Sequence, residues 1–90
     1  MTSYRLSPDA ACAVVDDGAV VLHMRTKRYF SLNETGAAIW RMLEDDVSLA
    51  VIPSRLTELY EVDVEAAAGA MTGLLEALAS EELIALVVNE

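Results

Sequence analysis

The residues with the greatest chemical potential in this chain are its single cysteine and its single histidine, Cys12 and His23. In a hairpin that turns at Asp17-Gly18, these two residues face each other across two strands. A thiol needs a neighbouring base or cation to become a thiolate at neutral pH, so the pair could serve as nucleophile and base. No neighbouring residue supplies an orienting partner or an oxyanion hole, and one Cys with one His does not complete a zinc site. We therefore interpret both as strand residues.

The carboxylates include three adjacent pairs, and each pair falls at an expected turn or helix end: Asp16-Asp17, Asp45-Asp46 and Glu81-Glu82. Paired carboxylates can perform general acid–base catalysis, but solvated boundary positions explain these pairs more simply. The sequence contains no glycine-rich phosphate loop and no nucleophile elbow. We therefore predict a protein that is not an enzyme, with no catalytic residue, no metal ligand set and no cofactor.

Length and composition predict one domain spanning residues 1–90, because 90 residues with 54% hydrophobic content can form a small core. The formal net charge of −9 repels phosphate backbones, so nucleic acid is not an expected partner. A single cysteine and the lack of a secretion signal favour a cytoplasmic location. The longest uncharged stretch, Ala66 to Leu75, is well below the roughly 20 residues that span a bilayer, so no membrane insertion is expected.

The chemistry-bearing residues must be positioned by a β-meander over about residues 11–32. Two runs rich in β-branched residues flank Asp17-Gly18, a strong two-residue hairpin signal. This loop places Ala13 opposite Leu22 and Cys12 opposite His23.

A second turn at residues 25–27 leads into the third strand. A three-residue loop sets Leu22 opposite Phe30, whereas a two-residue loop would place Phe30 on the other face. The last loop position favours a positive φ, which is a mild cost for Lys27. The three-residue loop gives the sheet one apolar face, formed by Ala13, Val15, Val20, Leu22, Phe30 and Leu32.

Three helices follow, at about residues 33–44, 48–60 and 63–81, with Asn33, Ser48 and Asp63 as expected N-caps. Pro53 interrupts the second helical pattern, so that helix is kinked or begins later. A final apolar run at residues 83–88 suggests a short strand, and an additional strand at residues 4–6 is compatible with the sequence. The predicted fold class is α+β and winged-helix-like: a three-stranded antiparallel β-sheet followed by three α-helices.

Arg25, Lys27 and Arg28 bring half of the six basic residues to the second turn of an acidic chain. They form either a solvated hairpin tip or a positive patch that steers an acidic peptide. The strand that follows, residues 29–32, is third in the meander and can leave one edge unpaired. Such an edge is either blunted or used to bind a peptide by strand addition.

The first half of the third helix is rich in small residues: Ala66, Ala67, Gly69 and Ala70. They either leave a shallow groove beside the sheet or allow the helix to pack closely against it. The sequence leaves both interpretations open.

Three segments in this order carry a resemblance to a known family: DGAVVLHMRTKRYFSLNETGAAIW, LTELYEVD and AMTGLLEALASEELI. Together they resemble the PqqD-like peptide-modification chaperones, also called recognition elements for ribosomally synthesised, post-translationally modified peptides. The resemblance covers about residues 11–84. It implies a winged-helix-like domain that binds the leader segment of a precursor peptide by extending the sheet along the third strand, against the third helix.

Carried onto this chain, the resemblance implies that the leader-binding strand runs from Arg28 to Leu32. The expected peptide-binding residues are Arg28, Tyr29, Phe30, Ser31 and Leu32 on the strand and Ala67, Ala70, Met71 and Leu74 on the helix. Arg25 and Lys27 are expected to supply steering charge. Lys27 stands where the family commonly has Gly, and Ala70 stands where it often has Asp, which leaves the expected groove more apolar.

The free-standing family members suggest two kinds of system. One is the chaperone of pyrroloquinoline quinone (PQQ) biosynthesis, which serves a radical-SAM enzyme. The other is the recognition subunit of lasso-peptide systems, which delivers the precursor to a cysteine-protease-like leader peptidase and a macrolactam cyclase. The short N-terminal segment before the first hairpin favours the lasso type.

A winged-helix DNA-binding regulator is the rival from another class, because one fold can serve several functions. It requires a basic recognition helix, whereas residues 63–78 contain no Lys or Arg. A small Cys-dependent enzyme is disfavoured further and would need an exposed, low-pKa Cys12.

Overall fold

The structure, a computed structural model, describes residues 2–88 and contains two antiparallel sheets and three helices. The predicted meander is present: β2 (Ala10–Val15), β3 (Gly18–His23) and β4 (Tyr29–Asn33) form a three-stranded sheet in the order β2-β3-β4. It is followed by α1 (Glu34–Glu44), α2 (Ile52–Leu59) and α3 (Val64–Ser80). The predicted α+β class, with a three-stranded antiparallel sheet before three helices, is confirmed.

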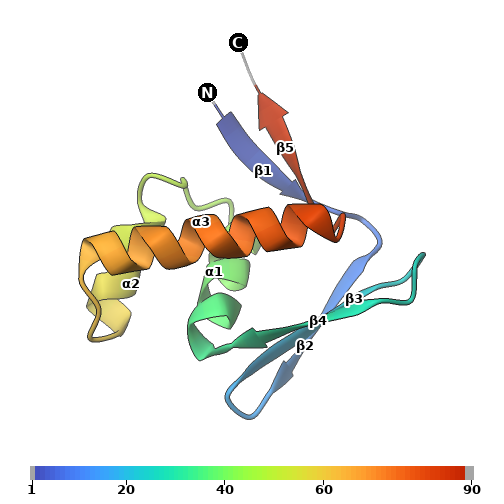
Figure 1. Cartoon of the computed structure of the whole chain (residues 1–90), viewed down its shortest axis with the longest axis horizontal. Coiled ribbons are helices and arrows are strands. Elements are labelled where there is room, and N and C mark those ends of the chain that lie inside the picture. Colours follow the sequence, from blue (N-terminus) through green and yellow to red (C-terminus); the bar gives the residue numbers. More distant parts are fainter. Residues whose placement is uncertain (1, 89–90) are drawn as a thin grey trace.

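The two ends of the described chain form the second sheet, in which β1 (Thr2–Leu6) pairs antiparallel with β5 (Ile84–Val88). Ser7 extends this ladder by donating its backbone N–H to the carbonyl of Leu83 at 2.9 Å. Figure 1 shows the two strands side by side, rising from the C-terminal end of α3 on the side away from the β2-β3-β4 sheet. Both terminal strands that the sequence suggested are therefore present.

The first hairpin turns one residue earlier than expected. Val15 pairs with Gly18, so the loop is Asp16-Asp17, and Cys12 pairs with Val21 rather than with His23. Gly18 has no positive φ, and a side chain there would collide with the carbonyl oxygen of Leu32. The glycine is thus required where two strand backbones approach closely, and this requirement displaces the turn signal that Asp17-Gly18 suggested.

The second turn is also longer than expected, because His23 and Arg28 close a four-residue loop. The amide of His23 donates to the carbonyl of Arg28, and the amide of Lys27 donates to the carbonyl of His23, both at 2.8 Å. Lys27 has φ 64°, so the expected left-handed position is confirmed. The imidazole Nδ1 of His23 accepts from the amides of Arg25 and Thr26 at 3.3 Å each, which stabilises this loop.

This loop changes which side of β3 faces the core. Val21 lies opposite Phe30, so the expected pairing of Leu22 with Phe30 is wrong. Phe30 and Leu32 do lie on the inner face, and their partners there are the alternate β3 residues Val21 and Ala19, with buried His23 at the end of the row. Hydropathy favoured burial of Leu22, whereas the structure buries His23, whose Nδ1 accepts two amides of the turn.

Two of the three expected helix caps are confirmed. Asn33 Oδ1 accepts from the amide of Gly36 at 2.8 Å, and Asp63 Oδ1 accepts from the amide of Ala66 at 2.7 Å. Ser48 is not the N-cap of α2; that position is Val51, without a side-chain cap, and Pro53 lies in the first turn. Proline fits there because its missing N–H would have no partner inside the helix, so the later start is confirmed.

Two of the three acidic pairs, Asp45-Asp46 and Glu81-Glu82, lie at the C-terminal ends of α1 and α3. Asp46 (φ 58°) and Glu82 (φ 59°) adopt the left-handed conformation just after the two helices. The next amides return to the last turns: Val47 donates to Met42 O and Leu83 donates to Leu78 O, both at 2.9 Å. Their placement at helix boundaries matches the structural interpretation of these carboxylates.

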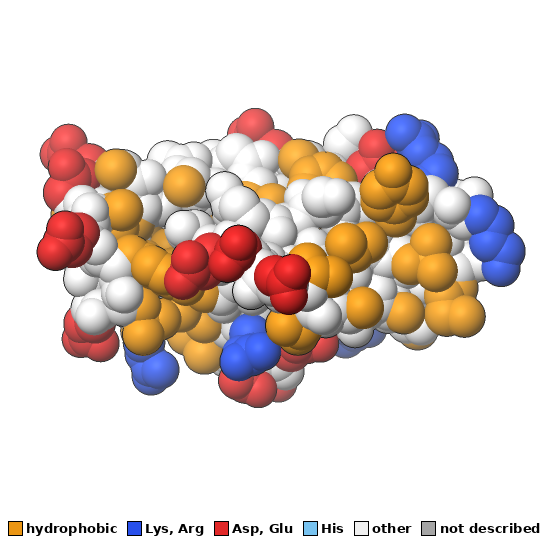
Figure 2. Space-filling view, turned by 90° about the horizontal axis from the view of Figure 1, so that it is seen from below, with side chains coloured by type: hydrophobic (Ala, Val, Ile, Leu, Met, Phe, Trp, Pro, Cys, Tyr) orange, Lys and Arg blue, Asp and Glu red, His pale blue; other side chains and the backbone are white. Residues whose placement is uncertain are grey.

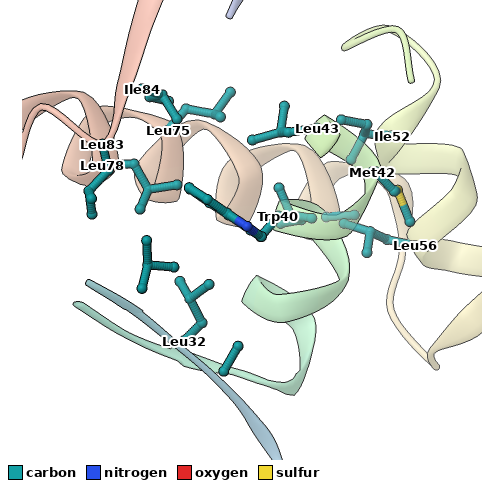
Figure 3. Close-up of a cluster of buried hydrophobic side chains, with 14 residues drawn as sticks. Leu32, Trp40, Met42, Leu43, Ile52, Leu56, Leu75, Leu78, Leu83 and Ile84 are labelled. Carbon is teal, nitrogen blue, oxygen red and sulfur yellow. The ribbon is translucent and has the colours of Figure 1, made fainter. Parts of the chain in front are cut away.

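The core lies where α1 packs against α2, α3 and the β2-β3-β4 sheet. Trp40 of α1 lies between α3 and the sheet, with Leu78 and Leu32 on opposite sides of it (Figure 3). Ile52 and Leu56 join α2 to this cluster, and both are fully buried. α1 thus connects α2 and α3 with β3 and β4, and it fixes how the sheet edges stand relative to the helices.

Candidate functional site

Strand β4 has an unpaired edge within the described sheet, because its sequence neighbour β3 is its one partner in the order β2-β3-β4. The amide of His23 bonds to the carbonyl of Arg28, which makes Arg28, Phe30 and Leu32 the residues that bond towards β3. By the alternation of an antiparallel ladder, Tyr29 and Ser31 direct their N–H and C=O groups outward. These four backbone groups are available to an added strand.

The side chains of β4 alternate between the core and solvent. Leu32 is buried and Phe30 is half-buried against the core cluster, while Tyr29 is 72% exposed and Ser31 is exposed. An added strand would therefore meet an open backbone edge bordered by Phe30 on its inner side and by Tyr29 on its outer side.

The predicted residues on α3 divide into two sets. Ala67 is 2% exposed and belongs to the core, so it has little surface to offer a ligand. Ala70 is exposed, whereas Met71 and Leu74 are half-buried and pack against the core. A Cβ added at Gly69 would meet no atom within 4 Å, so the small-residue stretch combines close packing at Ala67 with open surface nearby.

Ion pairs connect the basic turn that contains Arg25 and Arg28 to the residues that follow α3. Arg28 contacts Glu81 at 3.0 Å, and Arg25 contacts Glu82 at 3.5 Å and Asp9 at 3.6 Å. Both guanidinium groups are mostly exposed, and such pairs contribute about 0–1 kcal/mol. A carboxylate from a ligand could replace Glu81 or Glu82 at little cost. Together the start of β4 and the end of α3 enclose a small hollow lined by His23, Arg28, Tyr29, Glu81 and Leu83.

Cys12 and His23 do not form a nucleophile–base pair. Cys12 pairs with Val21, and His23 pairs with Ala10. Burial and the carboxylate of Glu44 raise the pKa of the Cys12 thiol. The guanidinium of Arg41 lowers this pKa by a smaller amount. A raised pKa keeps the thiol protonated at neutral pH. The imidazole of His23 is buried with Nδ1 engaged in the turn, and its Nε2 has no partner among the described residues.

The sequence did not predict a cavity of about 450 Å³ between β2, α1 and α2. Its walls include Cys12 and Val14 on β2, Ala37 and Ala38 on α1, and Leu59 at the end of α2. The expected register placed Ala13 and Val15 on the apolar face of the sheet and Cys12 and Val14 on the other face, so nothing in the sequence indicated this cavity.

Within residues 2–88 as described, no group of three or more His, Cys, Asp or Glu side chains could hold a metal ion. None of the helices in that part of the chain is long and apolar enough to cross a membrane.

The described sheet leaves one edge of β4 open, and Arg28 at the start of β4 pairs with Glu81 just after α3. The model of coenzyme PQQ synthesis protein D (PqqD) matches residues 18–84, most of the chain. This chain belongs to the PqqD family. The match begins at Gly18 of β3 and ends at Ile84 of β5, so it contains β4 and α3 in full.

Two solved structures resemble this PqqD-family chain along most of its length. "TbiB1 in Complex with the TbiA(beta) Leader Peptide" is 32% identical, with a TM-score of 0.81 over 89% of this chain and 93% of that one. "Lasso peptide synthetase B1 complexed with the leader peptide" is 33% identical, with a TM-score of 0.82 over 91% of this chain and 96% of that one. No curated protein sequence matches.

Proposed function

We propose that this PqqD-family protein is a non-catalytic, cytoplasmic recognition protein for the leader peptide of a ribosomally synthesised precursor. The observation that carries the proposal is the open edge of β4, where Tyr29 and Ser31 present unpaired backbone groups in a chain whose fold matches two leader-peptide complexes. An extended leader adds to that edge as a fourth strand of the sheet. The main-chain bonds give affinity with little dependence on leader sequence.

Side chains on both sides of the added strand then give specificity. The proposed binding residues are Arg28, Tyr29, Phe30, Ser31 and Leu32 on β4, with Ala70, Met71 and Leu74 on α3. Ala67 supports them from the core. Arg25 and Lys27 with Arg28 attract acidic leader residues to the start of β4.

The bound leader is delivered to a partner, for which we propose a cysteine-protease-like leader peptidase and a macrolactam cyclase, as in lasso-peptide biosynthesis. Holding the precursor beside such an enzyme raises its effective concentration there. The resemblance to lasso peptide synthetase B1 supports this choice. A role in PQQ biosynthesis beside a radical-SAM enzyme is the second candidate, favoured by the description of the matching family.

A fluorescence-anisotropy titration with a labelled leader peptide, from a precursor encoded beside this protein, tests the function. We expect saturable binding that a scrambled peptide of the same composition does not reproduce. Absence of binding up to high micromolar protein would refute leader recognition. Leaders from lasso-type and PQQ-type precursors, compared in the same titration, distinguish the two systems.

Ala70→Trp tests the face beside α3. Ala70 is exposed, so the bulky side chain leaves the core unchanged while it obstructs an added strand lying against the helix. We expect leader affinity to fall by about tenfold or more, with an unchanged circular-dichroism melting curve. A folded Ala70→Trp protein with wild-type affinity would exclude this part of α3 from the site.

A further inference from the structure

Strand β2 presents a second open edge, on the opposite side of the sheet from β4. The amide of Met24 donates to the carbonyl of Asp9 at 2.8 Å, which continues the β2-β3 register by one pair. Alternation from that pair directs the backbone groups of Ala11 and Ala13 towards β3 and those of Cys12 and Val14 away from it. Residues 11–15 are exposed along their whole length, so no element of the described chain covers this edge.

The cavity of about 450 Å³ lies beside this edge and can receive side chains from an added strand. Val14 is 71% exposed, and Leu59 across the cavity is 61% exposed, which are high values for large apolar side chains. The small Ala37 and Ala38 on α1 leave the space between them open. An open strand edge, exposed apolar side chains and an adjoining hollow together are typical of a surface that another protein covers.

The charge around the cavity is opposite to the charge at the start of β4. Five carboxylates line the cavity: Asp16, Asp17, Glu34, Glu44 and Asp45. Two cations, Arg41 and Arg55, offset them in part. In Figure 2, basic side chains gather at the right-hand end, which carries the β3–β4 turn in Figure 1, and acidic side chains predominate over the middle and the opposite end. The start of β4 and the cavity beside β2 therefore suit ligands of opposite charge.

We propose that the β2 edge and its cavity bind the enzyme that processes the leader-bound precursor, through an extended segment of that enzyme with Lys or Arg flanking apolar side chains. This proposal rests on the proposed function, because it names the partner of the same molecule. The apolar side chains enter the cavity, and the basic flanks meet its acidic rim. A second copy of this chain fits poorly, since two acidic rims would face each other.

One consequence is that leader and enzyme bind together rather than in competition. β2, β3 and β4 separate the two edges, and neighbouring strands are about 4.8 Å apart. An added strand at each edge would extend the sheet to five strands without overlap. The leader would then lie on the same rigid sheet as the enzyme that acts on the precursor.

Val14→Pro and Ser31→Pro form a matched pair of variants that tests this assignment. Each removes an outward amide from one sheet edge without removing a bond of the β2-β3-β4 ladder, as proline on an edge strand permits. The measurements are biolayer interferometry with the purified leader peptidase from the same biosynthetic system, and leader anisotropy in parallel. We expect Val14→Pro to weaken peptidase binding by about tenfold or more and to leave leader affinity within about twofold. We expect the reverse for Ser31→Pro.

Ala38→Leu keeps the test decisive if a proline variant fails to fold, because it fills the cavity from a helix position. Wild-type peptidase affinity in folded Val14→Pro or Ala38→Leu would overturn the inference while leader binding, measured separately, still supports the proposed function. A wild-type dimer that these variants dissociate would also overturn it, since a second copy would then occupy the edge. Loss of leader binding in the wild-type protein itself would instead refute the proposed function.

Discussion

Gly18 allows the backbones of β3 and β4 to approach each other closely. A methyl group at this position would collide with the carbonyl oxygen of Leu32, and backbone cannot move aside as a flexible side chain can. Gly18→Ala should therefore lower the free energy of unfolding by about 1–3 kcal/mol in urea denaturation. Gly73→Ala is the matched control: its Cβ meets nothing within 4 Å in the interior of α3, so it should stabilise by up to about 1 kcal/mol. Equal stability of the two variants would contradict this role.

Cys12 is the residue whose chemistry the sequence left open. Burial and Glu44 raise the pKa of its thiol, so the thiolate fraction at a given pH is smaller than in a free cysteine. We expect its reaction with a disulfide reagent to be slower than that of a cysteine-containing model peptide at pH 8, with a midpoint displaced to higher pH. Stopped-flow rates measured against pH provide the check. A midpoint below that of the peptide would reopen the case for a reactive cysteine.

At the scale of elements, the ion pairs between the start of β4 and the residues after α3 determine how much positive charge the proposed leader site presents. Arg28 is paired with Glu81 at 3.0 Å, so the ion pair competes with an acidic leader residue. Glu81→Gln should free Arg28 and raise leader affinity by about twofold to fivefold at low salt, whereas Arg28→Gln should lower it by a similar factor. Anisotropy titrations at two salt concentrations test both. Unchanged leader affinity in Arg28→Gln, or a lower affinity in Glu81→Gln, would show that Arg28 does not contact the leader.

The elements themselves follow largely from local signals in the sequence. Asn33 and Asp63 cap their helices as expected because a side-chain oxygen three residues before an amide is sufficient for the bond. Strand register depends instead on contacts distant in sequence. Gly18 could be recognised as a close-approach residue only once β4 was placed beside it, and His23 as buried only once its Nδ1 was seen to accept turn amides.

The two open strand edges, on β4 and on β2, also differ in how far the sequence predicts them. A third strand in a meander predicts an open edge on β4 from order alone, and the family resemblance named its residues. The β2 edge has the same topological property, but the expected register placed Ala13 and Val15 on the core face, whereas in the structure Cys12 and Val14 line the cavity. Cys12 and Val14 are exposed because α1 covers the inner face of the sheet over β3 and β4 and not over β2, whereas Ala11, Ala13 and Val15 lie on the outer face.

At the scale of the whole molecule, the chain ends are joined to the core through Leu83 and Ile84. Leu83 is 1% exposed, and its carbonyl accepts from Ser7 at 2.9 Å, so this residue joins β5, β1 and the helical core. Leu83→Ala should lower the free energy of unfolding by about 2–5 kcal/mol, through lost burial and the cavity that remains. Leu59→Ala makes the same chemical change at a side chain that is 61% exposed and should cost less than about 0.5 kcal/mol.

Urea denaturation of both variants measures the difference, and hydrogen exchange locates it. If the terminal sheet is part of one cooperative unit with the core, Leu83→Ala should increase amide exchange in β3 and α1 as well as in β1. If β1 and β5 instead unfold separately, only their own amides should exchange faster and the free energy of global unfolding should stay near the wild-type value. The second result would mean that the β2-β3-β4 sheet is stable without the paired chain ends.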